Sequence, residues 1–348
     1  MGTHTKSFCA AKITNLPGKE NTTVFIVNLT LSNFFRMAKH KSLKTLSYTE
    51  IKRILDETDK RVIFEKTNTI PENQDLHDKL RKYINYGDVS RKSVLGIDIF
   101  KYSSYGVFEQ TLIPFLFKTI FRMTVSLCLT NHRFIFQNHS RDYFDKHFIS
   151  TGDGGYVLFD TPLHSLVFAI NFAVVLRTYN SYHLYPKLRK IIGGVSMRYA
   201  ITIDKVYLFE NNFYGRGIIN CARILTKDDL NRCLIDENVH SWFTINMEGV
   251  ENLQVITVNE ISNIYDFKGY DKKLLNTTVD EIFQHDVTRR YGIINADILK
   301  IGKIASKETE LSIYNLHLQV TLNLVNDDDT SQKKTVTISL GNLNTSGI

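Results

Sequence analysis

The strongest constraint in this sequence is a single carboxylate inside an apolar strand. Residues 94–100 read Val-Leu-Gly-Ile-Asp-Ile-Phe, so Asp98 is the one charged side chain of the run. Such a run predicts a buried strand. An apolar core does not accept an unpaired carboxylate, so Asp98 must meet a metal cation or a basic side chain.

A second acid follows in a glycine-rich turn. Residues 150–156 read Ser-Thr-Gly-Asp-Gly-Gly-Tyr and separate the apolar runs 147–150 and 156–159. This pattern predicts a β-hairpin with its turn at Asp153. The tip of a hairpin carries its carboxylate outward.

The third motif is a predicted helix with two polar side chains on one turn. Residues 214–223 read Tyr-Gly-Arg-Gly-Ile-Ile-Asn-Cys-Ala-Arg, which places Asn220 and Arg223 close together. Two acids at strand ends, a glycine-rich turn and an arginine are the parts of a two-metal phosphoryl-transfer site. Each also has an ordinary interpretation: Asp98 as an ion-pair partner, Asp153 as a turn residue and Arg223 as a surface residue.

Composition sets the class of protein. With 348 residues, of which 43% are hydrophobic, the chain can bury a real core in two or three domains. A net charge of +7 favours polyanionic partners such as nucleoside triphosphates, or indicates only a solvated basic surface. The basic residues form short clusters without interleaved aromatics, which argues against a nucleic-acid binder. The four cysteines have no metal-binding or disulfide spacing, so we expect free thiols.

The sequence shows no secretory or membrane-spanning signal. The first residues lack a charged segment followed by an apolar one, and the most apolar run, 112–129, is broken by Lys118 and Arg122. We therefore expect a cytoplasmic protein with no stable membrane insertion.

Apolar periodicity and turn residues predict the order of elements that follows the Asp98 strand. These are a helix over 108–130, a strand over 133–136, the Asp153 hairpin, a helix from Thr161 to 176, a strand over 194–202, a strand over 205–209 that pairs back on it, and a helix from Gly215. This order predicts an α/β fold, an α+β sandwich with helices on one face of a mainly antiparallel sheet.

At the three motifs, over about residues 92–260, the chain resembles the class III nucleotide cyclases, the family of adenylyl and guanylyl cyclases. The matching residues are 96–99 around Asp98, Gly-Asp-Gly at 152–154 and, loosely, the helix at 215–223. The resemblance implies a ferredoxin-type catalytic domain over 91–262. An N-terminal extension of unknown role, 1–90, precedes it, with a strand near 24–31 and helices near 47–55 and 75–86. A β-rich module, 263–348, expected to act as a sensor, follows it, with a short helix at 280–286 and strands at 316–324 and 336–340.

The resemblance also implies roles for individual residues. Asp98 and Asp153, with the carbonyl of Ile99, would hold two Mg²⁺ or Mn²⁺ ions per site. Arg223 would stabilise charge on the α-phosphate. The remaining expected substrate-binding or catalytic residues are Phe100, Lys101, Tyr102, Ser103, Ser104, Ile149, Asn212, Arg216 and Asn220. Arg198 is a further candidate triphosphate contact. Each site would be shared between the two chains of a homodimer.

Three departures from the family pattern bear on the substrate. Ile149 stands where purine cyclases have a base-reading lysine, and Asn212 stands where adenylyl cyclases have a base-reading aspartate. The asparagine expected at Ile219 is shifted to Asn220. The combination is similar to the bacterial pyrimidine cyclases of the Pycsar anti-phage systems, which implies cyclic UMP or cyclic CMP from UTP or CTP, with UTP favoured. A phage-derived activator would remain to be identified. The alternatives are an adenylyl or guanylyl cyclase, and an inactive cyclase-like protein that binds nucleotide or nucleic acid.

Overall fold

The computed structural model describes residues 43–58, 74–85, 89–277, 280, 282–283, 291–305, 310–324 and 334–348. All of these belong to one compact unit of the chain, residues 37–348. The strand predicted near residues 24–31 and most of the short helix predicted at 280–286 lie outside the described residues.

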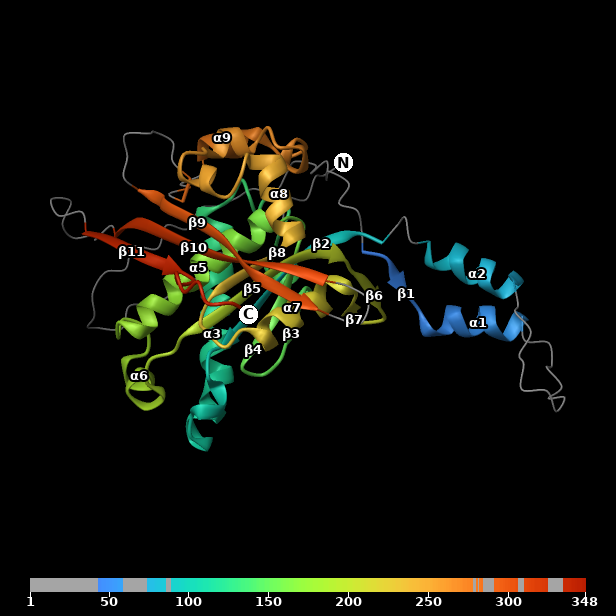
Figure 1. Ribbon diagram of the computed structural model, residues 1–348, viewed down its shortest axis with the longest axis horizontal. Helices are drawn as coiled ribbons and strands as arrows, with labels where there is room; N and C mark the ends of the chain where they lie inside the picture. The colour runs from blue at the N-terminus through green and yellow to red at the C-terminus, as the bar shows by residue number, and fades with distance from the viewer. Residues whose placement is uncertain are drawn as a thin grey trace, which may run out of the picture. The chain divides into compact units, whose positions relative to one another are not determined.

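A mixed sheet crosses the middle of this unit (Figure 1). Within the described residues its strands run in the order β11-β10-β8-β5-β2-β4-β3, and β9 also pairs with β10. The strands are β2 (Arg91–Ile99), β3 (Phe148–Ser150), β4 (Gly154–Phe159), β5 (Met197–Lys205), β8 (Cys233–Asp236), β9 (Gly292–Ala305), β10 (Glu310–Leu324) and β11 (Lys334–Leu340). Only β5 and β8 run parallel, so the predicted α/β class with a mainly antiparallel sheet is confirmed.

The first four of these strands have the ferredoxin-type arrangement. They occur along the chain as β2, helix, β3, β4, helix, β5, and lie side by side as β5-β2-β4-β3. The two crossover helices are α3 (Val107–Asn131) and α5 (Pro162–Asn180), both close to their predicted spans. Thr161 caps α5 by accepting a hydrogen bond from the His164 backbone N–H, and Pro162 fills its first turn, as the sequence indicates.

Helices cover both faces of the sheet, which corrects the prediction of a single covered face. Leu95, Ile97 and Ile99 of β2 point to one face and pack with α3, α5 and α8 (Glu237–Met247). The alternate residues Val94, Gly96 and Asp98 belong to the other face, where α7 (Arg216–Lys227) packs. A Cβ at Gly96 would lie 2.7 Å from Leu225 Cδ1, so a glycine here lets α7 approach the strand closely. The Asp98 face and the helix that carries Arg223 are therefore the same side of the sheet.

One predicted strand and one predicted strand pairing are wrong. Residues 133–136 form a turn after α3, and their apolar side chains are buried in it. Residues 207–209 form β6, which does not pair back on β5. Instead β6 pairs with β7 (Asn212–Tyr214) and, in parallel, with β1 (Thr45–Leu46) in a small separate sheet.

Residues 43–84, as far as the structure describes them, and the C-terminal strands both belong to this unit. The helices α1 (Tyr48–Thr58) and α2 (Gln74–Ile84) match the predicted ones and follow β1. The C-terminal strands do not build a sheet of their own, because β10 pairs with β8 over Ile313–Leu316 and extends the central sheet. The remaining short helices are α4 (Arg141–Lys146), α6 (Pro186–Ile192), α9 (Val258–Ile261), η1 (Tyr102–Ser104), η2 (Glu251–Gln254), η3 (Tyr265–Phe267) and η4 (Lys272–Thr277).

Two helices of the described part of the chain, α3 and α5, are long and apolar enough to cross a membrane by length and composition. In the apolar 18-residue stretch of α5, 78% is buried inside the protein, as expected for a core helix. In the corresponding stretch of α3, 44% is buried. Cys128, Cys221 and Cys233 are buried free thiols, as predicted.

One buried acid should make folding pH-dependent. Asp236 accepts a hydrogen bond from the Val239 backbone N–H (2.9 Å) and caps α8. Burial raises its pKa from an ordinary 3.8 to about 7. The folded state then binds a proton that the unfolded state has lost, so stability falls as the pH rises from about 4 to about 7, by at most roughly 4 kcal/mol.

The substitution Asp236→Asn keeps a capping oxygen and removes the charge. We expect the variant to lose this pH slope and to be more stable than the unmodified protein at pH 8. Urea denaturation at pH 5 and pH 8 measures both. If the free energy of unfolding changed equally with pH in the two proteins, the raised pKa would not belong to Asp236.

Candidate active site

The two predicted metal-binding acids lie side by side. Asp98 is near the end of β2 and faces Gly154 of β4 in the strand register. Asp153 precedes Gly154 in the turn between β3 and β4, so the hairpin prediction is confirmed. A Cβ at Gly154 would lie 2.2 Å from the Ile97 carbonyl oxygen. Glycine at this position therefore lets the turn close against β2 and brings Asp153 to Asp98.

The electrostatics of the pair agree with this geometry. The pKa of Asp153 is raised, first by burial and then by the negative charge of Asp98. A carboxylate whose proton affinity is raised by a second carboxylate beside it belongs to an arrangement that a divalent cation stabilises. Among the described residues no cluster of three or more His, Cys, Asp or Glu side chains could hold a metal. Two carboxylates suit Mg²⁺ or Mn²⁺, because these ions keep water and substrate phosphate oxygens as further ligands.

Asp98 also has a basic partner, as expected for a carboxylate in an apolar strand. Arg198 lies directly opposite it on β5, and its Nε and Nη2 atoms donate to Asp98 Oδ2 at 2.6 and 2.5 Å. Arg198 Nη1 donates to the Asp228 carbonyl oxygen at 2.6 Å. The arginine is thus fixed beside the two acids, where it can neutralise Asp98 or contact a phosphate.

The loop after β2 offers backbone donors next to the acids. The Phe100 N–H donates a hydrogen bond to the Ser196 carbonyl, and the Ser104 N–H donates one to the Lys101 carbonyl. These two N–H groups of the predicted phosphate-binding loop, residues 100–104, are therefore not free to bind phosphate. The N–H groups of residues 101–103 make no hydrogen bond to the described residues. Lys101 has a left-handed backbone (φ 58°), a strained conformation for a residue with a side chain. Residues 101–103 are therefore the part of the loop that can bind an anion.

Of the three residues predicted for the base pocket, Ile149 and Asn212 line one pocket, and Tyr102 is not among its lining residues. This pocket has a volume of about 1160 Å³, and Ile149 of β3 and Asn212 of β7 both border it. The rings of His147 and Tyr143 stack in its wall with centroids 3.8 Å apart, and Phe213 lies 5.4 Å from His147. Burial lowers the pKa of His147, which favours its neutral form, so the stacked pair is a flat part of the wall. Charged side chains border the same pocket, namely Lys92, Asp145, Lys146 and Asp160. Sequence reasoning missed Tyr143 and His147, because an aromatic pair four residues apart is common on any helix.

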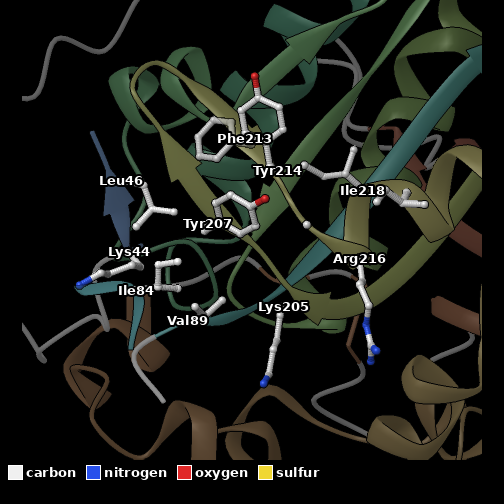
Figure 2. A pocket seen from close by; sticks show the side chains of 12 residues that line it. Lys44, Leu46, Ile84, Val89, Lys205, Tyr207, Phe213, Tyr214, Arg216 and Ile218 are labelled. Atoms are coloured by element: carbon white, nitrogen blue, oxygen red, sulfur yellow. The ribbon is translucent and has the colours of Figure 1, made fainter. Parts of the chain in front are cut away.

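Arg216 lies at a different pocket, of about 620 Å³ (Figure 2). Tyr207 occupies its middle, between Leu46 of β1 and Ile218 of α7. The Arg216 Nε atom pairs with Asp204 Oδ2 at 3.2 Å, and the side chain is largely exposed. Phe213 and Tyr214 border both pockets, so the pockets are neighbours across β7.

Asn220 and Arg223 are half-buried on α7. They lie one turn apart, on the side of the helix opposite the Cys221 and Leu225 contacts with β2. Arg223 makes no hydrogen bond or ion pair within the described residues. Its guanidinium is therefore available to a ligand or to another chain.

No family model matches the sequence, and no curated protein matches it either. Among solved structures, it is similar to an adenylate/guanylate cyclase/hydrolase from Silicibacter pomeroyi, at 12% identity and a TM-score of 0.33 over 65% of this chain and 96% of that one. The adenylyl cyclase CyaB from P. aeruginosa is also similar, at 12% identity and a TM-score of 0.33 over 65% and 94% of the two chains. The guanylate cyclase domain of RhGC from Catenaria anguillulae in complex with GTP gives 8% identity and a TM-score of 0.36 over 66% and 96%. Similarity at this level supports no conclusion about function, which must come from the geometry of the site.

Proposed function

We propose that this protein is a metal-dependent nucleotide cyclase that converts a pyrimidine nucleoside triphosphate, UTP before CTP, into the 3′,5′-cyclic monophosphate and pyrophosphate. The observation that carries the proposal is the meeting of Asp98 and Asp153 at adjacent strand ends, where each charge acts on the other. The class III motifs at 96–99, 152–154 and 215–223 support the same reaction.

The reaction is an intramolecular displacement. The ribose 3′-hydroxyl gives up its proton to solvent and its oxygen bonds to the α-phosphorus, while the bond from that phosphorus to the bridging oxygen breaks and pyrophosphate leaves. Asp98 and Asp153, with the Ile99 carbonyl, would hold Mg²⁺ or Mn²⁺, which would supply a lower pKa for the 3′-hydroxyl and positive charge for the triphosphate. The N–H groups of residues 101–103 bind the terminal phosphates, and Arg198 lies beside Asp98 as a further phosphate contact.

The pyrimidine preference rests on the larger pocket. Ile149 has no hydrogen-bond donor or acceptor in its side chain, and Asn212 carries an uncharged amide, where purine cyclases have Lys and Asp. A base held there packs against flat rings and can hydrogen-bond to side-chain amides, since Asn138 and Asn211 border the pocket together with Asn212. The test is incubation of the full chain with each of the four ribonucleoside triphosphates and Mn²⁺, with products identified by mass. Exclusive conversion of ATP or GTP would refute the pyrimidine assignment.

We place the protein in the cytoplasm as a second-messenger synthase of anti-phage defence, on the resemblance to the Pycsar cyclases. Residues 263–348 would sense the activating signal. Each active site is shared in a homodimer, with the acids from one chain and the base pocket, Asn220 and Arg223 from the other. In support of sharing, Arg223 is unpaired within the described residues of a single chain.

The expected effect of Arg223→Ala is a roughly hundredfold lower rate, because one preorganised donor to the developing phosphate charge is lost. Initial rates with saturating triphosphate and Mn²⁺ measure it. The matched control is Lys227→Ala, an exposed cation one turn further along α7. Equal rates for both variants would remove Arg223 from the site. If sites are shared, mixing Asp98→Ala with Arg223→Ala restores activity that neither variant has alone.

A second candidate function is nucleotide binding without turnover. The observation in its favour is the ion pair between Arg198 and Asp98, which satisfies the buried carboxylate without any metal. A protein of this kind would bind triphosphate and form no product with any of the four nucleotides at any Mn²⁺ concentration.

A further inference from the structure

One surface of the protein exposes aromatic and basic side chains together. It is built from the first half of α3 and from α6 with the loop before it, two segments that lie next to each other (Figure 1). The rings of Phe115 and Tyr185 are 6.0 Å apart, and the Tyr105 hydroxyl donates to the Gly194 carbonyl at 3.1 Å. We call this the α3–α6 surface; its residues are Val107, Phe108, Phe115, Lys118, Tyr182, Tyr185, Lys187, Lys190 and Ile191.

The apolar members of the surface are unusually exposed. Val107 is 81% exposed, Phe108 63% and Phe115 54%. Across the contact with α6, Tyr182, Tyr185 and Ile191 are each close to half exposed. Isolated exposed apolar residues are normal, but a group on two contacting segments marks an interaction site.

The charge around these rings has one sign. Residues 181–196 contain Lys187, Arg189 and Lys190 and no acid. In α3, Lys118 and Arg122 continue the exposed stripe that begins with Phe108 and Phe115, and Glu109 is the single acid of the helix. The surface therefore fits a partner that is negatively charged and accepts aromatic rings at its boundary.

The two exposed tyrosines of this surface, Tyr182 and Tyr185, have strained backbone conformations. Tyr182 and Tyr185 both have left-handed backbones, with φ of 65° and 46°. Non-glycine residues in this region are strained, and such strain concentrates at functional sites. The Arg189 guanidinium lies 4.9 Å above the Tyr182 ring, which joins a cation to the exposed aromatic.

We propose that the α3–α6 surface docks the protein on an anionic membrane surface as a peripheral protein. Tyrosine and phenylalanine favour the boundary between headgroups and acyl chains, and nearby lysines are attracted to anionic lipid. The helix α3 does not insert fully, because Ile113, Leu116 and Ile120 on its other face are buried in the core. The proposal rests on this surface alone and does not depend on the catalytic assignment.

The test is flotation of the full chain with phosphatidylcholine vesicles and with mixed phosphatidylglycerol–phosphatidylcholine vesicles. Binding is expected to the mixed vesicles and to weaken as salt is raised. The variant Lys187→Glu/Lys190→Glu should bind roughly thirtyfold more weakly or worse, since each lysine near the surface contributes about fivefold. The variant Phe108→Ser/Phe115→Ser/Tyr185→Ser should also lose binding, and its thermal unfolding curve shows whether the fold is intact.

The matched control is Tyr265→Ser/Lys268→Glu, an exposed aromatic and an exposed lysine three residues apart on η3. It should bind mixed vesicles like the unmodified protein. Absence of binding to mixed vesicles, or equal loss in the control, would overturn the proposal. So would a change of oligomeric state in the aromatic variant with vesicle binding unchanged, since the surface would then join two copies of the chain.

Discussion

Replacing Asp98 with alanine is expected to abolish formation of cyclic nucleotide while the protein stays folded. Asp98 and Asp153 are the two carboxylates that meet at the ends of β2 and β4, so either substitution removes half of the anionic site. A lost metal contact removes several kcal/mol of transition-state stabilisation, which corresponds to roughly a thousandfold or more in rate. Product formation from each triphosphate with Mn²⁺, and thermal unfolding, are the two measurements.

Asp153→Ala should have the same effect, and chelation of divalent ions should reproduce it in the unmodified protein. Asp229→Ala is the matched control, because Asp229 is an exposed acid on the loop after α7. If Asp98→Ala or Asp153→Ala turned over at a rate near that of the control, the metal assignment would be wrong. The same variants separate the enzyme from a metal-free binder, whose nucleotide affinity would survive both changes.

Replacing Arg232 with alanine is expected to destabilise the protein by about 3–5 kcal/mol. Arg232 is 1% exposed, and its Nη2 and Nε atoms lie 2.7 and 2.8 Å from Asp228 Oδ1. Its Nη1 atom donates to the Ser346 carbonyl at 2.7 Å. Removing the guanidinium leaves the Asp228 carboxylate buried without its partner and deletes one hydrogen bond to the C-terminal residues. The free energy of unfolding in urea measures the loss.

The comparison for this prediction is the exposed pair of Lys303 and Glu310. Lys303→Ala should change the unfolding free energy far less, because solvent already screens that pair. The double variant Arg232→Met/Asp228→Asn should recover part of the lost stability, since no lone charge remains buried. Equal effects of Arg232→Ala and Lys303→Ala would show that the buried pair does not stabilise the fold.

The Arg232 pair also connects the C-terminus with the site. The Asp228 carbonyl accepts a hydrogen bond from Arg198, which in turn holds Asp98. We therefore expect Arg232→Ala to form cyclic nucleotide more slowly than the unmodified protein, in addition to being less stable. The rate is measured at low temperature, where the variant is folded.

The sequence correctly predicted those elements that are determined by a motif of only a few consecutive residues. The apolar run before Asp98, the Gly-Asp-Gly-Gly turn and the Thr161-Pro162 cap each determine a strand, a turn or a helix start without reference to distant residues. The strand predicted at residues 133–136 is absent, because a run of three apolar residues after Arg133 is equally compatible with a buried turn. The strand β9 was missed, because its pairing with β10 shifts register twice and its burial does not alternate regularly.

Partner choice between strands could not be predicted. β6 pairs with β1, from which it is separated by nearly half the length of the chain, and β10 pairs with β8. Both choices depend on tertiary packing. In the site, the need of Asp98 for a cation was evident from the sequence. That the partner is Arg198 required the β2–β5 register, which places the two residues opposite each other.

The most direct test of the site is the number of Mn²⁺ ions bound in the presence of a nucleoside triphosphate analogue that cannot cyclise, counted by electron paramagnetic resonance. A pair of ions per site is expected for the unmodified protein, and loss of that pair for Asp98→Asn/Asp153→Asn, which keeps the size of both side chains. Unchanged Mn²⁺ binding in the double variant would contradict the assignment of these two aspartates as the metal site.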